Sequence, residues 1–420
     1  MTAREYPVFT VTPKAERSVR AGHPWVYGEE VTAVEGAYQN GDMVDVVSNK
    51  GRYLGTGWVN DHSKIRVRII SRNANDTFDE AFFRRRVCYA LNYRKTVMGP
   101  VDYRCCRLIF GEADQFPGLT VDRFENILVT QVLSLGMERR KDWVYRALVE
   151  LLREDGEQID AIYERNDVTI RTLEGLEQGK GFYQMEGLEQ GKGFYQMEGL
   201  RTDLSGHVTI TENGIKYDVD YIEGQKTGFF LDQKYNRQAA AKLARGRRVL
   251  DCFTHTGAFA LNAAAAGAEH VTAVDVSAFA LELAAENGKR NGLTNLDYKC
   301  ADVFDLLTEM AKEKKCDYDY IILDPPAFTK SRATAKNAYH GYKEINRKAM
   351  RLLPRGGYLA TCSCSHFMTD EMFRKMLREA ALDAGVTLRQ IEARQQAPDH
   401  PILPEVPETD YLKFYLLQVV

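Results

Sequence analysis

Short runs of alternating apolar and polar residues fill the first 72 positions of the chain. Runs of this kind predict half-buried β-strands. The clearest are 44–47, 53–59 and 65–70. In the last run Arg66 and Arg68 alternate with isoleucine and valine, so one face of that strand is basic and the other apolar. We therefore expect a small β-barrel over residues 1–72.

The pattern changes after residue 72, where helical and strand periodicities mix. Helices are expected over 82–95 and 140–153, and 122–134 alternates like a strand around a turn. The twelve residues GLEQGKGFYQME then occur twice in succession, over 175–198. Two copies are too few for a solenoid, and their glycines favour a surface loop, with contact to RNA as a second interpretation. We expect a mixed α+β middle domain, residues 73–205, that carries this loop.

Strand and helix patterns alternate in the rest of the chain. Asn213-Gly214 lies between alternating apolar positions and predicts a hairpin with a type I′ turn, within a hairpin and connector over 206–230. Buried strands separated by helices are then expected at 249–253, 271–276, 320–323 and 358–361. Such alternation predicts a parallel, doubly wound sheet, so an α/β domain of Rossmann-like type is expected over 231–420.

Composition narrows the class of protein. Hydrophobic residues make up 44% and charged residues 27% of the chain, as in folded globular proteins. No apolar run approaches the ~20 residues of a membrane helix, and the first residues do not form a secretory signal. The eight cysteines include no C-x-x-C pair, which argues against a zinc site and a disulfide framework. We expect a cytoplasmic protein with no metal and no membrane contact.

The net charge of −3 conceals an asymmetry along the chain. The first 110 residues contain 17 Lys and Arg against 12 Asp and Glu, whereas the remainder contains 39 against 47. A basic N-terminal segment suits a polyanionic partner. Ordinary solvated charge explains the same numbers, so the asymmetry alone does not decide. The sequence also leaves open whether the chain forms a homodimer.

Candidate chemistry lies where the predicted C-terminal strands end. The first strand runs into a glycine-containing turn, at the edge where open α/β sheets bind nucleotide-like ligands. This turn is not G-x-G-x-x-G, so it disfavours a dinucleotide and fits S-adenosylmethionine. A carboxylate at the second strand end can accept ribose hydroxyl protons, and one at the third can meet adenine. The candidate cofactor residues are Asp251, Phe253, Thr254, Thr256, Gly257, Asp275, Val276, Asp302 and Val303. Each aspartate alone could simply cap a helix, but three in order favour a cofactor site.

Two further strand ends carry candidate reactive groups. The fourth ends in Asp324-Pro325-Pro326, a rigid turn that projects a carboxylate beside the cofactor, so Asp324 is a candidate cofactor residue as well as a catalytic one. Phe328 can stack on a flat base. The fifth leads into Cys362-Ser363-Cys364-Ser365. A free cysteine is usually an inert core residue, but this edge is where a nucleophilic thiol would be placed.

With these motifs the chain resembles the ribosomal large subunit methyltransferase I family, bacterial enzymes that methylate carbon 5 of a cytosine in 23S ribosomal RNA. The resemblance extends over essentially the whole chain. It rests on Gly22-His23-Pro24-Trp25-Val26, Gly111-Glu112-Ala113-Asp114, Pro117-Gly118, Val121-Asp122-Arg123-Phe124, and the segments 226–233, 341–346 and 397–401. It implies an N-terminal PUA-like RNA-binding barrel, a class I methyltransferase domain, S-adenosylmethionine as cofactor, with Lys226 and Phe230 among its contacts, and ribosomal RNA as partner.

The family's S-C-S pattern falls on Ser363-Cys364-Ser365, which implies that Cys364 is the nucleophile and Asp324 holds the base edge. The residues expected to contact RNA are Pro325, Pro326, Phe328, Arg66 and Arg68. The chain departs from the family at Ala327, where lysine is usual, with Lys330 nearby, and in the duplicated loop. Both departures bear on the RNA target. Two other functions stay open: methylation of a guanine or adenine nitrogen, which needs no cysteine, and ribosome binding without catalysis.

Overall fold

The computed structural model describes residues 5–184, 199–313, 316–329 and 334–420. The chain folds as two compact units, each assembled from segments that are distant in sequence. Unit 1 comprises Met1–Ile210, Val219–Leu231 and Pro398–Thr409; unit 2 comprises Thr211–Asp218, Asp232–Ala397 and Asp410–Val420. Among the described residues, no helix combines the length and the apolar character that crossing a membrane requires.

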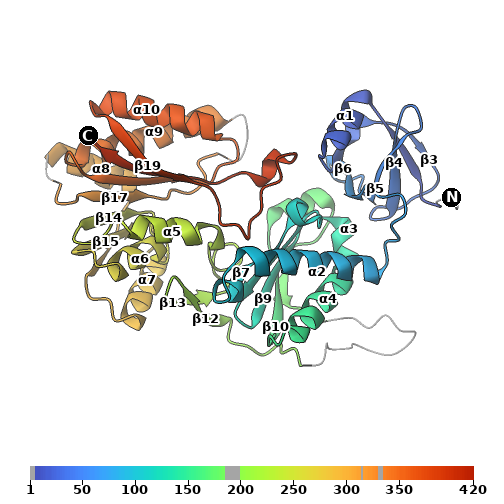
Figure 1. Ribbon diagram of the computed structural model, residues 1–420, viewed down its shortest axis with the longest axis horizontal. Helices are drawn as coiled ribbons and strands as arrows, with labels where there is room; N and C mark the ends of the chain where they lie inside the picture. Colours follow the sequence, from blue (N-terminus) through green and yellow to red (C-terminus); the bar gives the residue numbers. More distant parts are fainter. Residues whose placement is uncertain (1–4, 185–198, 314–315, 330–333) are drawn as a thin grey trace. The chain divides into compact units, whose positions relative to one another are not determined.

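Unit 1 begins with a six-stranded sheet, drawn in blue in Figure 1, in the order β2-β6-β5-β4-β1-β3. Its elements are β1 (Val8–Val11), α1 (Pro13–Ala21), β2 (Trp25–Tyr27), β3 (Val31–Glu35), β4 (Met43–Ser48), β5 (Tyr53–Val59) and β6 (Ile65–Ser71). Gly57 is required where β5 meets β6, because a Cβ there would lie 2.0 Å from the Arg68 carbonyl oxygen. The bounds of β4, β5 and β6 confirm the strands that the sequence predicted at 44–47, 53–59 and 65–70.

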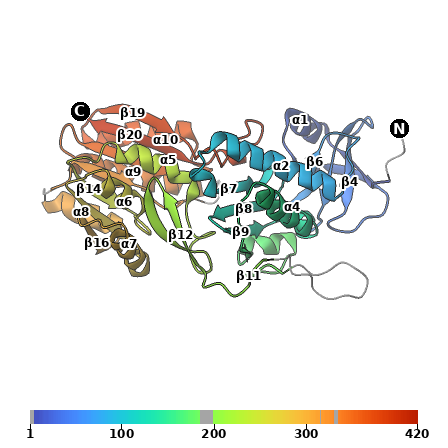
Figure 2. The same cartoon turned by 60° about the horizontal axis from the view of Figure 1, so that its bottom comes forward.

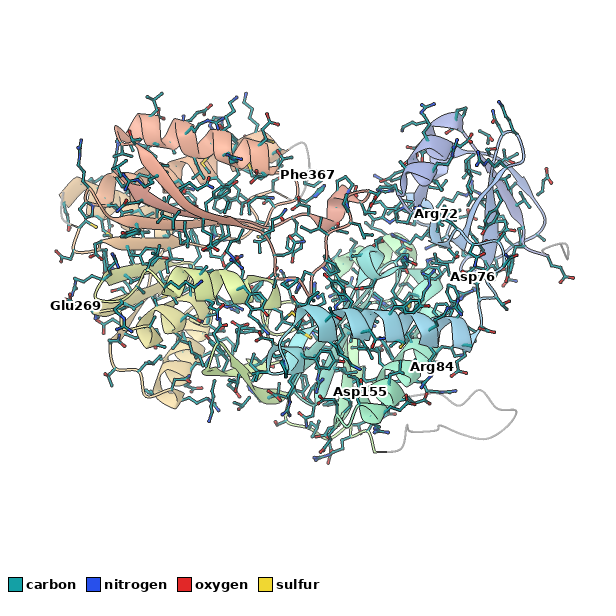
Figure 3. The ribbon with its side chains drawn as sticks, in the orientation of Figure 1. Arg72, Asp76, Arg84, Asp155, Glu269 and Phe367 are labelled. Carbon is teal, nitrogen blue, oxygen red and sulfur yellow. The ribbon has the colours of Figure 1, made fainter. Side chains whose placement is uncertain are left out.

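A second sheet of unit 1 has five strands in the order β11-β10-β9-β8-β7. Its strands are β7 (Cys105–Phe110), β8 (Leu119–Phe124), β9 (Ile127–Val132), β10 (Ala161–Arg165) and β11 (Lys180–Phe182), and its helices are α2 (Glu80–Val97), α3 (Leu135–Glu138) and α4 (Lys141–Glu154). Helices α2 and α4 lie side by side in both ribbon views (Figures 1 and 2). Arg84 on α2, labelled in Figure 3, donates to Glu150 and Glu154 on α4, each at 2.7 Å.

The tandem repeat differs from the expected surface loop in its first copy. Lys180–Phe182 form strand β11, which pairs antiparallel with β10. Tyr183 is buried, and its hydroxyl donates to Asp142 at 2.5 Å. The first copy thus supplies an edge strand rather than a loop alone, while residues 185–198, including the whole second copy, lie outside the described residues.

The predicted hairpin is present as β12 (His207–Glu212) and β13 (Ile215–Asp220). Its turn residues Asn213 and Gly214 have φ of +53° and +79°. Both central φ angles must be positive in a type I′ turn, so the structure agrees with the turn predicted from Asn-Gly.

Unit 2 is built on a seven-stranded sheet in the order β16-β15-β14-β17-β18-β20-β19. The strands are β14 (Arg248–Cys252), β15 (His270–Asp275), β16 (Leu296–Cys300), β17 (Tyr320–Leu323), β18 (Tyr358–Ser363), β19 (Leu388–Arg394) and β20 (Lys413–Val419). The first five are parallel, as predicted, but β20 is antiparallel to both of its neighbours, so the sheet is mixed.

Helices cover both faces of this sheet (Figure 1). They are α5 (Lys234–Ala241), α6 (Ala258–Ala265), α7 (Ala278–Arg290), α8 (Val303–Glu313), α9 (Ala335–Leu352) and α10 (Asp370–Ala384). One core cluster joins the sheet to α8, α9 and α10, and a second joins it to α5 and α6. The strand order reverses between β14 and β17, and such a reversal opens a crevice at the carboxyl ends of those strands.

Candidate active site

The turn after β14 lies at the reversal of strand order. Thr254 donates its hydroxyl hydrogen to Oδ2 of Asp251 at 2.5 Å, and the Gly257 amide donates to the Thr254 carbonyl at 2.9 Å. Gly257 has φ +84°, and a Cβ on it would lie 2.9 Å from Cβ of Ala284 on α7. Glycine is required here for both reasons, because the turn is left-handed and packs closely against a helix.

Asp251 is a fully buried carboxyl group with an incomplete set of partners. Its Oδ1 has no hydrogen-bond partner among the described residues. Burial raises the pKa of Asp251 to about 7; the Thr254 hydrogen bond opposes this shift, and the nearby Asp324 adds to it. A buried oxygen without a partner is costly, and protonation of the carboxyl at this raised pKa reduces that cost. A contact of Asp251 with S-adenosylmethionine stays a prediction, because the side chain is fully covered by protein atoms.

Asp275 is the last residue of β15, and Asp302 lies two residues after the end of β16, close to the strand ends where the sequence predicted them. Both carboxylate oxygens of Asp275 accept backbone amides, from His255 and Ser277 at 2.9 Å each. Each oxygen keeps a further lone pair for a hydroxyl group. Oδ1 of Asp302 instead accepts the amides of Phe304 and Asp305 at 2.8 and 3.2 Å. Asp302 therefore caps α8, the alternative considered from the sequence, and a contact with adenine stays a prediction.

The other predicted cofactor residues differ in what they expose. Val276 is 72% exposed beside Asp275, whereas Val303 is buried and packs in the core. Phe253 is partly buried against the same core, and Thr256 is buried in the turn. Lys226 and Phe230 belong to unit 1, where the Lys226 ammonium lies 4.5 Å from the centre of the Phe230 ring. Val276 is therefore an exposed apolar residue at the carboxyl ends of the parallel strands, where a flat ligand could pack on it.

Asp324 directly follows β17 and lies among polar groups that the sequence did not reveal. Its Oδ1 accepts a hydrogen bond from the Gln233 side chain at 3.0 Å. Burial first, and the nearby Asp232 second, raise the pKa of Asp324 to about 6. A carboxyl group with this pKa is ionised in most molecules at pH 7 and protonated in a minority, and the protonated form can donate a hydrogen bond.

The two cysteines of the following strand end have different environments. Cys362 is fully buried, and burial followed by the charge of Asp324 raises the pKa of its thiol well above the usual value. Cys364 is half-buried, and its Sγ lies 4.0 Å from the Pro325 carbonyl oxygen. Accessibility therefore favours Cys364 over Cys362 as a nucleophile, and the sulfur lies beside the Asp-Pro-Pro turn.

Aromatic residues pack beside this turn. The ring centre of Phe328 lies 4.6 Å from that of Tyr342 and 5.8 Å from that of Phe304. The Tyr342 hydroxyl is hydrogen-bonded to the Ser365 hydroxyl at 3.1 Å. Phe328 is thus partly covered by its neighbours, while Pro326 is exposed. Lys330 lies outside the described residues.

Lys413, the first residue of β20, contacts the backbone that follows Cys364 and was missed from the sequence. Its ammonium donates to the carbonyl oxygens of Ser365 at 2.7 Å and Tyr411 at 2.8 Å. It is only 4% exposed. The signal that could have identified it is a lysine that precedes the apolar run Phe414–Leu417.

The basic strand face predicted in unit 1 is largely neutralised by neighbours. Arg68 is 9% exposed and pairs with Glu174 at 2.8 Å and Glu112 at 3.4 Å. Arg66 pairs with Asp61 at 2.9 Å and remains partly exposed. These contacts favour Arg66 over Arg68 for any contact with RNA, which stays a prediction for both. No cluster of three His, Cys, Asp or Glu side chains suited to a metal occurs among the described residues.

Known proteins match this chain over nearly its whole length. A PUA-like domain model matches residues 9–72, and an S-adenosylmethionine-dependent methyltransferase model matches residues 192–417. A protein from Pseudoalteromonas atlantica named ribosomal RNA large subunit methyltransferase I is 39% identical over 413 residues, which are 98% of this chain and 99% of that protein. One of the same name from Shewanella denitrificans is 41% identical over 410 residues, 97% and 98% of the two chains.

Solved structures share the fold. A putative S-adenosylmethionine-dependent methyltransferase from Streptococcus mutans is 22% identical, with a TM-score of 0.78, over 98% of this chain and 100% of that one. A putative methyltransferase crystallised with S-adenosylhomocysteine has the same TM-score and coverage at 21% identity. The mixed sheet and the N-terminal strands described above are therefore those of a methyltransferase fold preceded by a PUA-like domain.

Proposed function

Since the chain belongs to the ribosomal RNA large subunit methyltransferase I family and uses S-adenosylmethionine, we propose that it methylates carbon 5 of a cytosine in 23S ribosomal RNA through a covalent bond to Cys364. The observation that carries the proposal is the half-buried Cys364 thiol beside the Asp324-Pro325-Pro326 turn. Methylation of cytosine carbon 5 needs such a nucleophile at carbon 6 to activate the ring, whereas methylation of a nitrogen does not.

The proposed chemistry follows from the low reactivity of carbon 5. The Cys364 thiolate adds to carbon 6 of the ring, and the electron pair of the 5,6 double bond becomes available at carbon 5. S-adenosylmethionine supplies the methyl group that carbon 5 takes up. A base then removes the proton from carbon 5, the double bond re-forms, and the thiolate leaves. No atom of the enzyme is consumed.

Asp324 is proposed to hold the Watson–Crick edge of the cytosine. Its raised pKa, about 6, keeps part of the population protonated near neutral pH. The protonated carboxyl can donate to ring nitrogen 3 and reduce the negative charge that builds on the ring when the thiolate adds. The hydrogen bond from Gln233 fixes the carboxyl group's orientation. A base stacked inside a helix cannot reach a thiol and a carboxyl group at the edge of a folded sheet, so the target nucleotide must leave its stack.

The product of the reaction tests the proposal. The purified protein is incubated with methyl-labelled S-adenosylmethionine and with 23S ribosomal RNA, either naked or in large subunits, from cells lacking the gene. Nucleoside analysis by mass spectrometry should then show labelled 5-methylcytidine at one position, the same position that is unmodified in those cells. Labelled methylguanosine or methyladenosine would establish nitrogen methylation instead. Cofactor binding with no labelled nucleoside on either RNA would favour a ribosome-binding protein.

Replacing Asp275 with alanine should weaken the binding of S-adenosylmethionine by tenfold or more. The proposal gives this carboxylate two ribose hydroxyl donors, and each charge-assisted hydrogen bond is worth roughly 1.5–3 kcal/mol. Isothermal calorimetry measures the change. The matched control is Asp297→Ala, because the Asp297 side chain, on the adjacent strand β16, is 76% exposed. Equal affinities for the two variants would remove Asp275 from the cofactor site.

A further inference from the structure

We propose that unit 1 contains a second contact site for the RNA, a cavity beside α2 that binds one unpaired nucleotide through its phosphate at Arg86 and its base at Tyr89. The residues of this cavity belong to unit 1, whereas those of the candidate active site around Asp324 and Cys364 belong to unit 2. The inference rests on the proposed function only in taking RNA as the substrate. It is independent of which atom of the target base receives the methyl group.

The cavity has the size and the walls of a binding site for a small planar ligand. Its volume is about 360 Å³, within the roughly 300–1,000 Å³ of pockets that hold small ligands. One wall is formed by Arg86, Tyr89, Ala90 and Tyr93 of α2. Their spacing of three, four and seven residues places these four side chains on one face of the helix. Residues 113–115 and 401–403 line the rest.

Arg86 gives the cavity a positive charge. The residue is only 8% exposed, and its guanidinium carbon lies 4.4 Å from the centre of the Phe82 ring. Its one hydrogen bond within the described residues goes to the neutral carbonyl oxygen of Gln115, at 3.0 Å. Burial lowers the pKa of Arg86 to about 10, so the side chain is still charged at neutral pH. Because a buried charge without a paired anion is unfavourable, the site favours an anionic ligand.

Two acidic residues near Arg86 are already paired with other arginines. Asp76 lies 3.4 Å from the guanidinium of Arg85. Asp114, which lines the cavity, accepts hydrogen bonds from Arg94 through both of its carboxylate oxygens. These pairs leave Arg86 as the cation that an incoming phosphate would meet in the cavity. An apolar peptide in the same place would leave this charge unpaired, so charge favours a phosphate-bearing ligand over a protein segment.

The two tyrosines supply the surface for a base. Tyr89 is 63% exposed and Tyr93 is 36% exposed, although both rings are large and apolar. The Tyr93 hydroxyl donates to the Pro398 carbonyl oxygen at 3.0 Å, which restrains that side chain. Proteins that bind single-stranded nucleic acid stack bases on such aromatic side chains and contact the backbone with cations. Bases within a duplex are stacked on one another, so the nucleotide that fits this cavity is an unpaired one.

The experiment measures the binding of a fluorescein-labelled single-stranded RNA of about twelve nucleotides and mixed sequence to the full chain by fluorescence anisotropy, over a series of salt concentrations. Tyr89→Ala should weaken binding by fivefold or more, the lower end of what one stacked base supplies, and Tyr89→Trp should retain it. Arg86→Gln should weaken binding and reduce the slope of log affinity against log salt by about 0.7, the share of one phosphate contact.

Two matched variants are the controls. Val101→Ala truncates another exposed apolar side chain of unit 1, which is 65% exposed. Arg104→Gln removes another positive charge from unit 1, and the Arg104 side chain is 56% exposed. Neither residue lines the cavity, so both variants should bind the RNA within twofold of the wild type.

A cross-linking experiment locates the contact directly. The same RNA with 4-thiouridine in place of uridine is irradiated with the wild-type protein, and mass spectrometry should identify cross-links on the α2 peptide that contains Tyr89 and Tyr93. Cross-links confined to other peptides would rule the cavity out. The exposed Tyr89 tolerates substitution even if Arg86→Gln does not fold, so wild-type RNA affinity in Tyr89→Ala would refute the proposal on its own.

Two further probes test the kind of ligand. A duplex of the same sequence should bind without any loss in Tyr89→Ala, and an equal loss on the duplex would contradict a contact with an unpaired base. AMP that competes as strongly as the labelled RNA would show a site for free nucleotides instead. Each of these results is separate from the product of methylation. Formation of 5-methylcytidine together with wild-type RNA binding in Tyr89→Ala would refute this inference alone, and nitrogen methylation would refute only the proposed function.

Discussion

Replacing Cys364 with alanine is expected to abolish methyl transfer, with a loss of turnover of roughly 10⁴-fold or more, as is found when a covalent nucleophile is removed. The affinity for S-adenosylmethionine should not change, because the thiol is not among the proposed cofactor contacts. Cys362→Ala should retain measurable activity, since that thiol is buried and burial raises its pKa well above the usual value. Initial rates with labelled cofactor, together with calorimetry, measure both quantities.

A trapping experiment distinguishes loss of the nucleophile from general damage. RNA with 5-fluorocytidine at the target should remain bonded to the enzyme after methyl transfer, because fluorine cannot leave carbon 5 as a proton does. The covalent complex should form with the wild type and Cys362→Ala and be absent with Cys364→Ala. If Cys362→Ala is inactive and Cys364→Ala active, the nucleophile lies two residues earlier. If both variants methylate fully, no covalent bond is needed and nitrogen methylation is the better explanation.

Removing Glu212 is expected to destabilise unit 2 by about 3–5 kcal/mol, the usual cost of leaving one charge of a buried pair without its partner. Arg237 donates to both carboxylate oxygens of Glu212, at 2.7 and 2.8 Å, and both side chains are buried. Glu212→Gln keeps the shape and leaves the guanidinium uncompensated. Urea unfolding followed by hydrogen exchange of unit 2 peptides measures the loss.

Fluorescence is unsuited to that measurement, because the chain's three tryptophans, Trp25, Trp58 and Trp143, all lie in unit 1. The control is Asp203→Asn, which breaks the exposed pair of Asp203 with Arg201 and should leave stability unchanged. The double variant Arg237→Met/Glu212→Leu should recover part of the stability, since apolar residues replace a buried pair well. A single variant as stable as the control would show that the pair contributes little.

The pattern of apolar and polar residues predicted the strands in which that pattern was regular. Strands β5 and β17 have the predicted bounds, because an alternating or wholly apolar run between turn residues defines both ends. The ordered aspartates were found because carboxyl ends of parallel strands meet at one edge. Strand β20 was not predicted, since alternation of strands and helices gives no sign of an antiparallel strand inserted beside β18. Lys413 was missed with it.

Long-range partners account for the other differences. Alternation correctly placed Arg68 on the face opposite its apolar neighbours, but Glu112 and Glu174, which neutralise it, are 44 and 106 residues away. Likewise, β11 forms only because β10 offers an edge. Gln233 meets Asp324 across 91 residues. Each of these contacts depends on the completed fold, so the sequence pattern around one partner contains no information about the other.

The order of strands in the unit 2 sheet also constrains how the protein is made. Strand β20 lies between β18 and β19 but is synthesised after both. Until it emerges from the ribosome, β18 has an unpaired edge beside the nascent S-C-S turn, and β19 has no neighbour in the sheet. Unpaired strand edges of partly made chains are prone to aggregation. The methyltransferase sheet is therefore completed only after nearly all of unit 2 has been translated, and two of its strand edges stay exposed until then.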